Sequence, residues 1–68
     1  MSVKCTVVIQ KEENWYVAKS LENGVVSQGR TIDEAMINLS EAIALYYEDT
    51  KEETTFEPIF VTTLEVAI

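Results

Sequence analysis

The stretch that decides the fold runs from Ser27 to Tyr47 and reads SQGRTIDEAMINLSEAIALYY. Thr31 can cap a helix by accepting a hydrogen bond from a free amide of the first turn, and Glu34 can reach back to the Thr31 amide, as in a capping box. Asp33 and Glu34 also place negative charge at the positive end of the helix dipole. These signals predict a helix that begins near Thr31.

Apolar residues spaced by three and four define the face of this helix that we expect to pack on a sheet. They are Ile32, Ala35, Met36, Leu39, Ala42, Ile43 and Tyr46. Glu34, Glu41 and Glu48 repeat along the opposite face. Ile37 and Leu45 lie beside these acids and should be partly exposed. We call these five residues the acidic helix surface and predict that it contacts a partner protein.

Three segments before the helix are predicted to be strands. Val3 to Gln10 alternates in polarity, which is typical of a half-buried strand. A polar turn leads to a second strand, Trp15–Ser20. Asn23-Gly24 favours another tight turn because both residues accept positive φ. A short third strand, Val25–Gln28, completes an antiparallel meander.

A last strand is expected at Ile59–Val66, after a polar connection from Asp49 to Glu57. Both of its faces are more apolar than an isolated edge strand should be, so we expect it to be covered on both sides or paired across an oligomer interface. The predicted fold is α+β with the order β-β-β-α-β. A right-handed crossover would place the fourth strand parallel to the first, giving the strand order 3-2-1-4 with one helix packed on one face.

The size of the chain favours self-association. Its 68 residues form one domain, residues 1–68, and a domain this small is only marginally stable alone. Cys5 is its single cysteine and it has no histidine, so neither an internal disulfide nor a zinc site can compensate. We therefore predict a homo-oligomer.

The charge of the chain bears on its partners. Twelve acidic residues against five basic ones give a net charge of −7. A nucleic-acid binder needs a basic surface, so we expect no direct nucleic-acid binding. An acidic surface suits a basic partner protein, although acidity that only aids solubility is equally compatible with the charge. No apolar run approaches the ~20 residues of a membrane span, and no signal peptide is recognised, so we expect a cytoplasmic protein that does not bind membranes.

The chain lacks the usual equipment for catalysis. Without histidine there is no common general base and no Ser-His or Cys-His pair. Gly24 and Gly29 are both expected at turns rather than in a phosphate loop. The predicted order is also the front half of a ribonuclease H-like fold, whose nucleases bind divalent metals through acids on core strands. In this chain Glu65 is a lone acid on the predicted last strand, so we expect no group of carboxylates on the core strands that could bind a metal ion together. We predict no enzyme activity, no catalytic or metal site and no cofactor.

From Trp15 to Tyr46 the chain resembles the N-terminal domain of the HicB-family antitoxins. That family typically shows a YVA strand, a turn ending in glycine, the pattern SQG-x-T-x-x-EA and a second EA pair. The corresponding residues here are Tyr16-Val17-Ala18, Gly24, Ser27-Gln28-Gly29, Thr31, Glu34-Ala35 and Glu41-Ala42. The family's CPEL turn is replaced by Lys19-Ser20-Leu21-Glu22.

The resemblance implies a partial ribonuclease H-like fold without nuclease activity. It also implies binding to a HicA-type toxin, a small basic ribonuclease that the antitoxin neutralises by covering its active surface. Full antitoxins carry a C-terminal DNA-binding domain, and we expect this chain to be a stand-alone HicB-like domain. The expected function is that of an antitoxin-like interaction protein of a type II toxin-antitoxin system, which neutralises an mRNA-cleaving toxin by direct binding. The alternative is a self-assembling structural or ligand-sensing module with no toxin partner.

Overall fold

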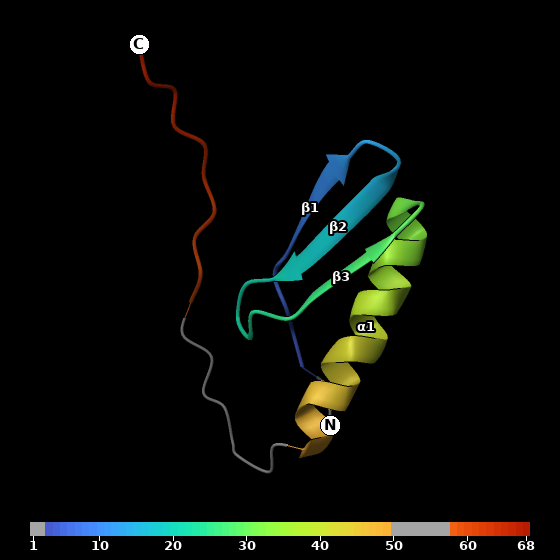
Figure 1. Cartoon of the computed structure of the whole chain (residues 1–68). Coiled ribbons are helices and arrows are strands. Elements are labelled where there is room, and N and C mark those ends of the chain that lie inside the picture. Colours follow the sequence, from blue (N-terminus) through green and yellow to red (C-terminus); the bar gives the residue numbers. More distant parts are fainter. Residues whose placement is uncertain (1–2, 50–57) are drawn as a thin grey trace.

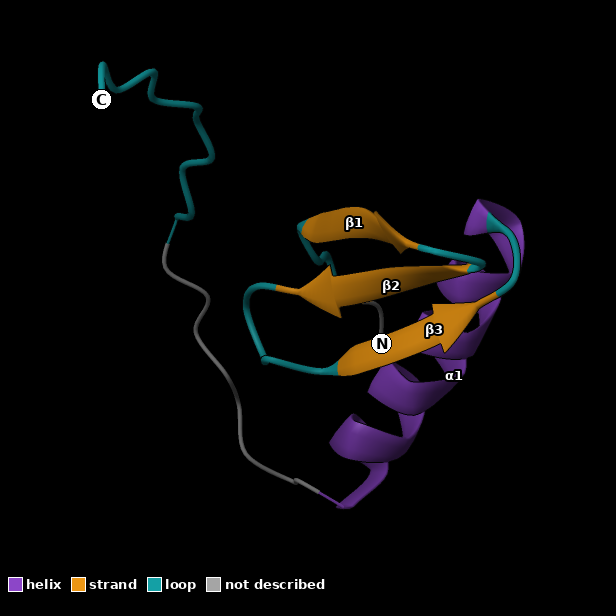
Figure 2. Ribbon diagram, turned by 45° about the horizontal axis from the view of Figure 1, so that its top comes forward, coloured by secondary structure: helices purple, strands orange, loops and turns teal. Residues whose placement is uncertain are grey.

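The computed structural model describes residues 3–49 and 58–68 of the chain. Three strands are followed by one helix (Figure 1), and their bounds are β1 Val7–Glu12, β2 Trp15–Ser20, β3 Val26–Gly29 and α1 Ile32–Asp49. The strands form an antiparallel sheet in the order β1-β2-β3. Figure 2 shows α1 lying across one face of this sheet. The predicted α+β class and the three-strand meander are therefore confirmed.

Two turns set the register of the sheet. Glu12 pairs with Trp15, so Glu13 and Asn14 alone join β1 to β2. The predicted first strand, Val3–Gln10, is therefore displaced, because the two-residue turn lets the ladder run on to Glu12. In the second turn Gly24 has a φ of 73°, a left-handed conformation that glycine adopts without steric cost.

The core between the helix and the sheet is small. Ala18, Ala35 and Leu39 are its fully buried apolar side chains among the described residues. Partly buried neighbours pack around them, namely Val7, Ile9, Tyr16, Val25 and Ile43. Because α1 packs mainly on β2 and β3, it leaves the β1 side of the sheet less covered.

The predicted apolar face of the helix is only partly correct. Ala35 and Leu39 are buried as expected, and Ala42 and Ile43 are half-buried. Ile32, Met36 and Tyr46 remain 48%, 39% and 43% exposed. Ile32 and Tyr46 lie near the ends of α1, and Met36 faces the uncovered β1 side. Periodicity identifies the side of a helix but not how much sheet lies beneath it.

The junction between β3 and α1 depends on Gly29. A Cβ at this position would lie 2.5 Å from the Ala35 backbone nitrogen and 2.9 Å from the Glu34 Cβ. From the sequence Gly29 is expected at a turn, but it is the last residue of β3 and pairs with Tyr16. Its role is to let the strand approach the first turn of the helix closely. Directly after it Thr31 caps the helix, and the Glu34 amide donates to Thr31 Oγ1 at 3.0 Å.

The expected fourth strand is not formed. Residues 58–68 have no strand assignment, and every residue among them is exposed. This segment extends away from the sheet and from α1 (Figures 1 and 2). The predicted parallel strand at Ile59–Val66 is therefore wrong for the single chain. Within the described residues, α1 lies on one side of the sheet, so it offers a cover for one face of such a strand only. The expected connection lies outside the described residues at positions 50–57.

Replacing Gly29 by alanine should destabilise the fold. We expect Gly29→Ala to lower the free energy of unfolding by about 2 kcal/mol, because the added methyl forces β3 and α1 apart. Gly24→Asn is the matched control, since asparagine tolerates positive φ and nothing lies within 4 Å of the Gly24 position. Urea denaturation of both variants provides the comparison. Equal losses for the two variants would contradict the close-approach explanation.

Candidate functional site

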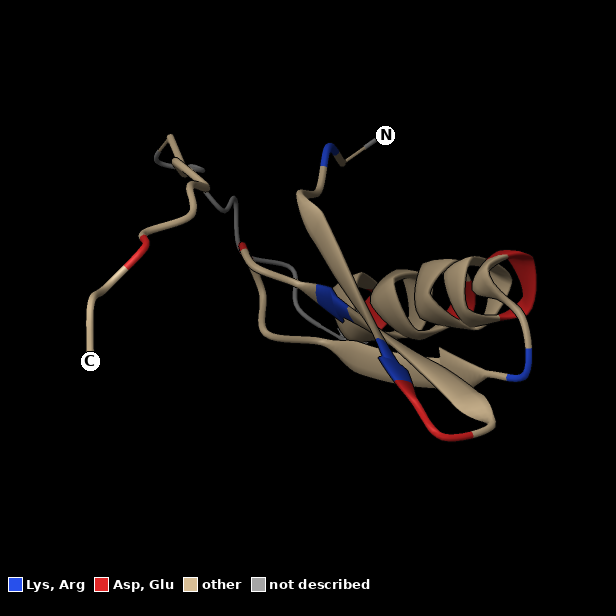
Figure 3. Ribbon diagram, turned by 90° about the horizontal axis from the view of Figure 1, so that it is seen from above, with Lys and Arg blue, Asp and Glu red and all other residues tan. Residues whose placement is uncertain are grey.

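The acidic helix surface is exposed along the whole of α1. Ile37 is 60% exposed and Leu45 is 63% exposed. Glu34, Glu41 and Glu48 are also exposed. Acidic positions recur along the helix in Figure 3. The structure thus brings together on one surface the five residues that the sequence predicted as a partner-binding site.

Asn38 fixes the orientation of this surface relative to the sheet. Its side-chain Nδ2 donates a hydrogen bond of 2.8 Å to the Gln28 carbonyl oxygen of β3. The acidic helix surface therefore adjoins β3 and is held on a helix that the sheet anchors. Sequence reasoning missed this contact. The available signal was an amide side chain within an otherwise apolar run, Ile37-Asn38-Leu39.

The charges along α1 are unevenly matched to its dipole. The first turn carries Asp33 and Glu34, which interact favourably with the positive end of the helix. The last turn contains no basic residue, and Glu48 lies there beside the negative end. This carboxylate is therefore in an unfavourable field, which a positively charged partner would relieve.

A carboxylate clamp holds the segment that precedes β1. The Thr6 amide donates to both Glu22 carboxylate oxygens at 2.7 and 3.0 Å, and Thr6 Oγ1 donates to Oε2 at 2.8 Å. The Leu21 amide donates to the Thr6 carbonyl at 2.9 Å. The hydrogen bond from the Thr6 backbone amide is the main cause that holds the pKa of Glu22 below its usual range. Sequence reasoning had assigned Glu22 only to a turn.

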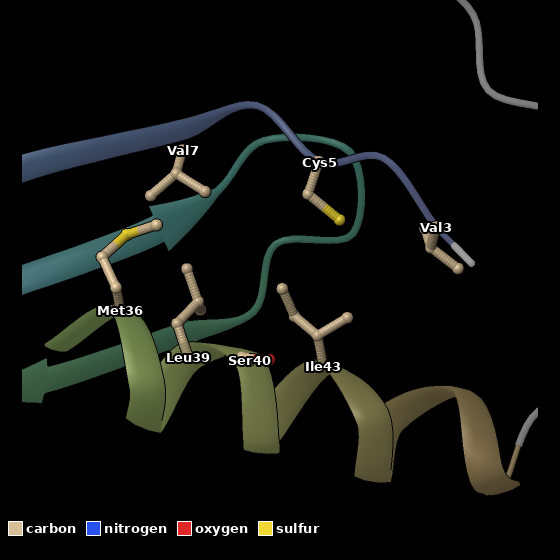
Figure 4. Close-up of a pocket in the computed structure, with 7 residues that line it drawn as sticks. All are labelled: Val3, Cys5, Val7, Met36, Leu39, Ser40 and Ile43. Carbon is tan, nitrogen blue, oxygen red and sulfur yellow. The ribbon is translucent and has the colours of Figure 1, made fainter. Parts of the chain in front are cut away.

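An apolar groove lies between this N-terminal segment and α1 (Figure 4). We call it the β1 groove, and its lining residues are Val3, Cys5, Val7, Met36, Leu39, Ser40 and Ile43. In Figure 4 the strand-side residues point toward the helix, and Met36, Leu39 and Ile43 point back toward them. Its volume is about 160 Å³. Small-molecule sites usually occupy roughly 300–1,000 Å³, so this groove is better suited to side chains.

Asn23 ties together the two walls near one end of the groove. Its Nδ2 lies 3.7 Å from Cys5 Sγ and 3.5 Å from the Tyr47 hydroxyl oxygen. Its Oδ1 accepts a hydrogen bond of 3.1 Å from the Val25 amide, which shapes the turn before β3. The single cysteine therefore lies half-buried in the groove wall.

Within residues 3–49 and 58–68, no three His, Cys, Asp or Glu side chains come together in a way that could hold a metal ion. In the same part of the chain, α1 is neither long nor apolar enough to traverse a bilayer.

These features define a small α+β domain with an acidic helix surface and an apolar groove beside an edge strand. The chain belongs to a family of unknown function, DUF7387, which matches residues 4–66. A UPF0150 protein of Thermoplasma acidophilum is 40% identical over 52 residues, covering 74% of this chain and 75% of the relative. A UPF0150 protein of Helicobacter pylori is 49% identical over 43 residues, covering 62% and 60%. No solved structure matches the chain significantly.

The family names do not state an activity. The chain is thus a member of a small uncharacterised family, and its HicB-like resemblance stays a prediction. The acidic helix surface and the β1 groove are two places in the described residues where a partner can be accommodated.

The Glu22 clamp should make stability sensitive to acid. Because the pKa of Glu22 is lower in the folded state, its ionised form stabilises the fold above the unfolded pKa of about 4.3. This contribution is lost as the pH falls through the folded pKa. We expect Glu22→Gln to remove that part of the acid dependence, measured as unfolding free energy between about pH 3 and pH 6. Glu41→Gln is the exposed control, and identical pH profiles for wild type and Glu22→Gln would contradict the assignment.

Proposed function

We propose that this protein is an antitoxin-like interaction protein of a type II toxin-antitoxin system, which neutralises a small basic HicA-type toxin by direct binding. The observation that carries the proposal is the pair Ile37 and Leu45, 60% and 63% exposed on the acidic helix surface. Exposed apolar side chains rimmed by charged residues are a common arrangement at protein contacts. The excess of acid, with a net charge of −7, suits a basic partner.

The apolar and the acidic residues of the acidic helix surface would contribute to binding in different ways. Burying Ile37 and Leu45 against a partner would remove their apolar area from water and supply affinity. Glu34, Glu41 and Glu48 would attract a positively charged surface and orient it during the encounter. The Thr31 cap and the Asn38 anchor hold the helix in place before binding, so little order has to be gained in the complex.

The motif residues of the HicB-like resemblance have definite structural roles here. Ala18 is fully buried, Gly29 permits the close approach of β3 to α1, and Thr31 caps the helix. These roles support a shared fold, and we propose that the complete domain is a partial ribonuclease H-like fold. In this proposal the protein is not an enzyme, has no cofactor and acts in the cytoplasm, where an mRNA-cleaving toxin would work.

The second candidate is a self-assembling structural or ligand-sensing module without a toxin partner. The observation that favours it is the exposure of apolar side chains along residues 58–68, including Phe60 at 90% and Leu64 at 84%. Such a segment favours association between copies of the chain whatever the cellular role. The two candidates differ in whether a small basic ribonuclease also binds.

Charge reversal on the helix tests the proposal. Glu41→Lys combined with Glu48→Lys should weaken binding to a purified small basic HicA-type toxin by roughly tenfold or more. It should also reduce the salt dependence of binding, measured by calorimetry at two ionic strengths. The matched control is Glu12→Lys with Glu13→Lys, which makes the same charge change at the β1–β2 turn.

The results of this experiment distinguish an error in the assigned binding surface from an error in the proposed function. Unchanged affinity of the helix variant would show that this surface is not the binding site. Failure of the wild-type protein to bind such a toxin, or to inhibit its cleavage of RNA, would contradict the antitoxin function. A strong effect of the control reversal would indicate a general charge effect and count against a contact at α1.

A further inference from the structure

The outer edge of β1 is open. β1 pairs with β2, and no strand of the described part of the chain lies on its other side. The opposite outer strand, β3, lies beside α1 and is tied to it through Asn38 and the Gln28 carbonyl (Figure 2). An open edge presents unpaired amides and carbonyls and readily accepts another strand. Charged residues discourage pairing at an exposed strand edge. In β1 they are Lys11 and Glu12, which lie at its C-terminal end.

The chain also contains an uncovered segment with the pattern of a strand. We call residues 58–68 the tail. Its exposed large apolar residues are Ile59, Phe60, Val61, Leu64, Val66 and Ile68. Soluble monomers rarely leave so many adjacent apolar side chains in water. The eight residues from Ile59 to Val66 would span roughly 26 Å as a strand, which exceeds the six-residue length of β1.

Both faces of the tail require a cover. In an extended segment Phe60, Leu64 and Val66 lie on one face, whereas Ile59 and Val61 lie on the other. Strands that read as apolar on both faces are usually buried on both. The β1 groove can receive one of these faces only, because α1 lies on one side of the sheet.

The face of the sheet opposite α1 also exposes apolar side chains that need a cover. Val8, Trp15 and Val26 lie on the side away from α1 and are 37%, 40% and 52% exposed. In the part of the chain that the structure describes, α1 covers only the opposite face. A second copy of the chain offers a groove for the tail and further residues to pack against this face. It can therefore cover both the tail and the open face of the sheet.

We propose that the tail of one copy pairs along the β1 edge of a second copy, and reciprocally, to form an exchanged-strand homodimer. Apolar side chains of the tail enter the β1 groove of the partner between Cys5 and Val7 on one wall and Met36 and Ile43 on the other. The arrangement is a closed twofold assembly in which each copy gives and receives one strand. This inference goes beyond the proposed function and does not depend on it, because the acidic helix surface lies on the side of α1 that adjoins β3.

The single cysteine makes the exchange directly testable. One chain keeps Cys5 and its natural tail. The other carries Cys5→Ala and one new tail cysteine, with Phe60→Cys, Leu64→Cys or Val66→Cys in separate variants of the 68-residue chain. A disulfide between the two chains can form only across copies, and a size tag on one chain identifies it on a non-reducing gel. We expect this mixed disulfide at one of the three positions after mild oxidation.

A matched control excludes random collision. The acceptor chain is replaced by Cys5→Ala with Glu13→Cys, whose cysteine is exposed at the turn far from the groove. The mixed disulfide should form several-fold less with this acceptor. Absence of a mixed disulfide with Cys5 at all three positions would overturn the proposal. A disulfide formed only within a chain that carries both Cys5 and the tail cysteine would also overturn it, since the tail would then close on its own sheet.

The mass in solution gives an independent test. Light scattering should find a dimer of the 7.7 kDa chain, and Leu64→Asp should raise the dimer dissociation constant roughly tenfold or more. The domain should stay folded by circular dichroism, because Leu64 is 84% exposed in the single chain. Ile37→Asp, on the acidic helix surface, should leave the mass unchanged. A monomeric wild type, or a dimer lost in Ile37→Asp but kept in Leu64→Asp, would contradict the exchange.

Discussion

The close approach of β3 to the first turn of α1 decides the arrangement of this domain. Gly29 permits it because any Cβ at that position would collide with backbone atoms of Glu34 and Ala35. Thr31 then starts the helix at once, and Asn38 fixes it to β3 about two turns later. As a result α1 lies over β2 and β3, buries Ala18, Ala35 and Leu39 between them, and leaves β1 at an uncovered edge.

Two separate surfaces follow from this placement. The acidic helix surface lies outward on a helix that the sheet anchors, whereas the β1 groove lies on the other side of α1 beneath an open edge. The first combines acids with exposed Ile37 and Leu45, and the second is lined mainly by apolar side chains. Their chemistry suits different partners, so self-association through the groove leaves the helix free to bind a basic protein. A core this small makes such association valuable for stability.

The sequence predicts the features of the fold that depend on residues close together in the chain, namely a helix cap, a turn and a strand. The Thr31 cap, the Gly24 turn and the alternation of Trp15–Ser20 each depend on neighbours within a few residues, and the structure confirms them. The five-residue acidic helix surface could be read from helical periodicity, and its exposure is as predicted, although its binding role stays a prediction. The contacts of Asn38 with Gln28 and of Glu22 with Thr6 join residues 10 and 16 positions apart, so no local pattern reveals them. The strand predicted at Ile59–Val66 rested on the alternation of its side chains between two faces. Alternation shows which side chains need to be buried, but it does not show which strand edge the segment pairs with.

The central claim is that the β1 edge and the tail complete each other between copies. Amide hydrogen exchange of the full-length protein, followed across a range of protein concentrations, tests it most directly. We predict that the amides of Ile59–Val66 and the outward amides of β1 become protected together as the concentration rises through the dimer dissociation constant, while β2 is protected throughout. Tail amides that exchange freely at every concentration, or that are protected equally at the lowest one, would contradict the account.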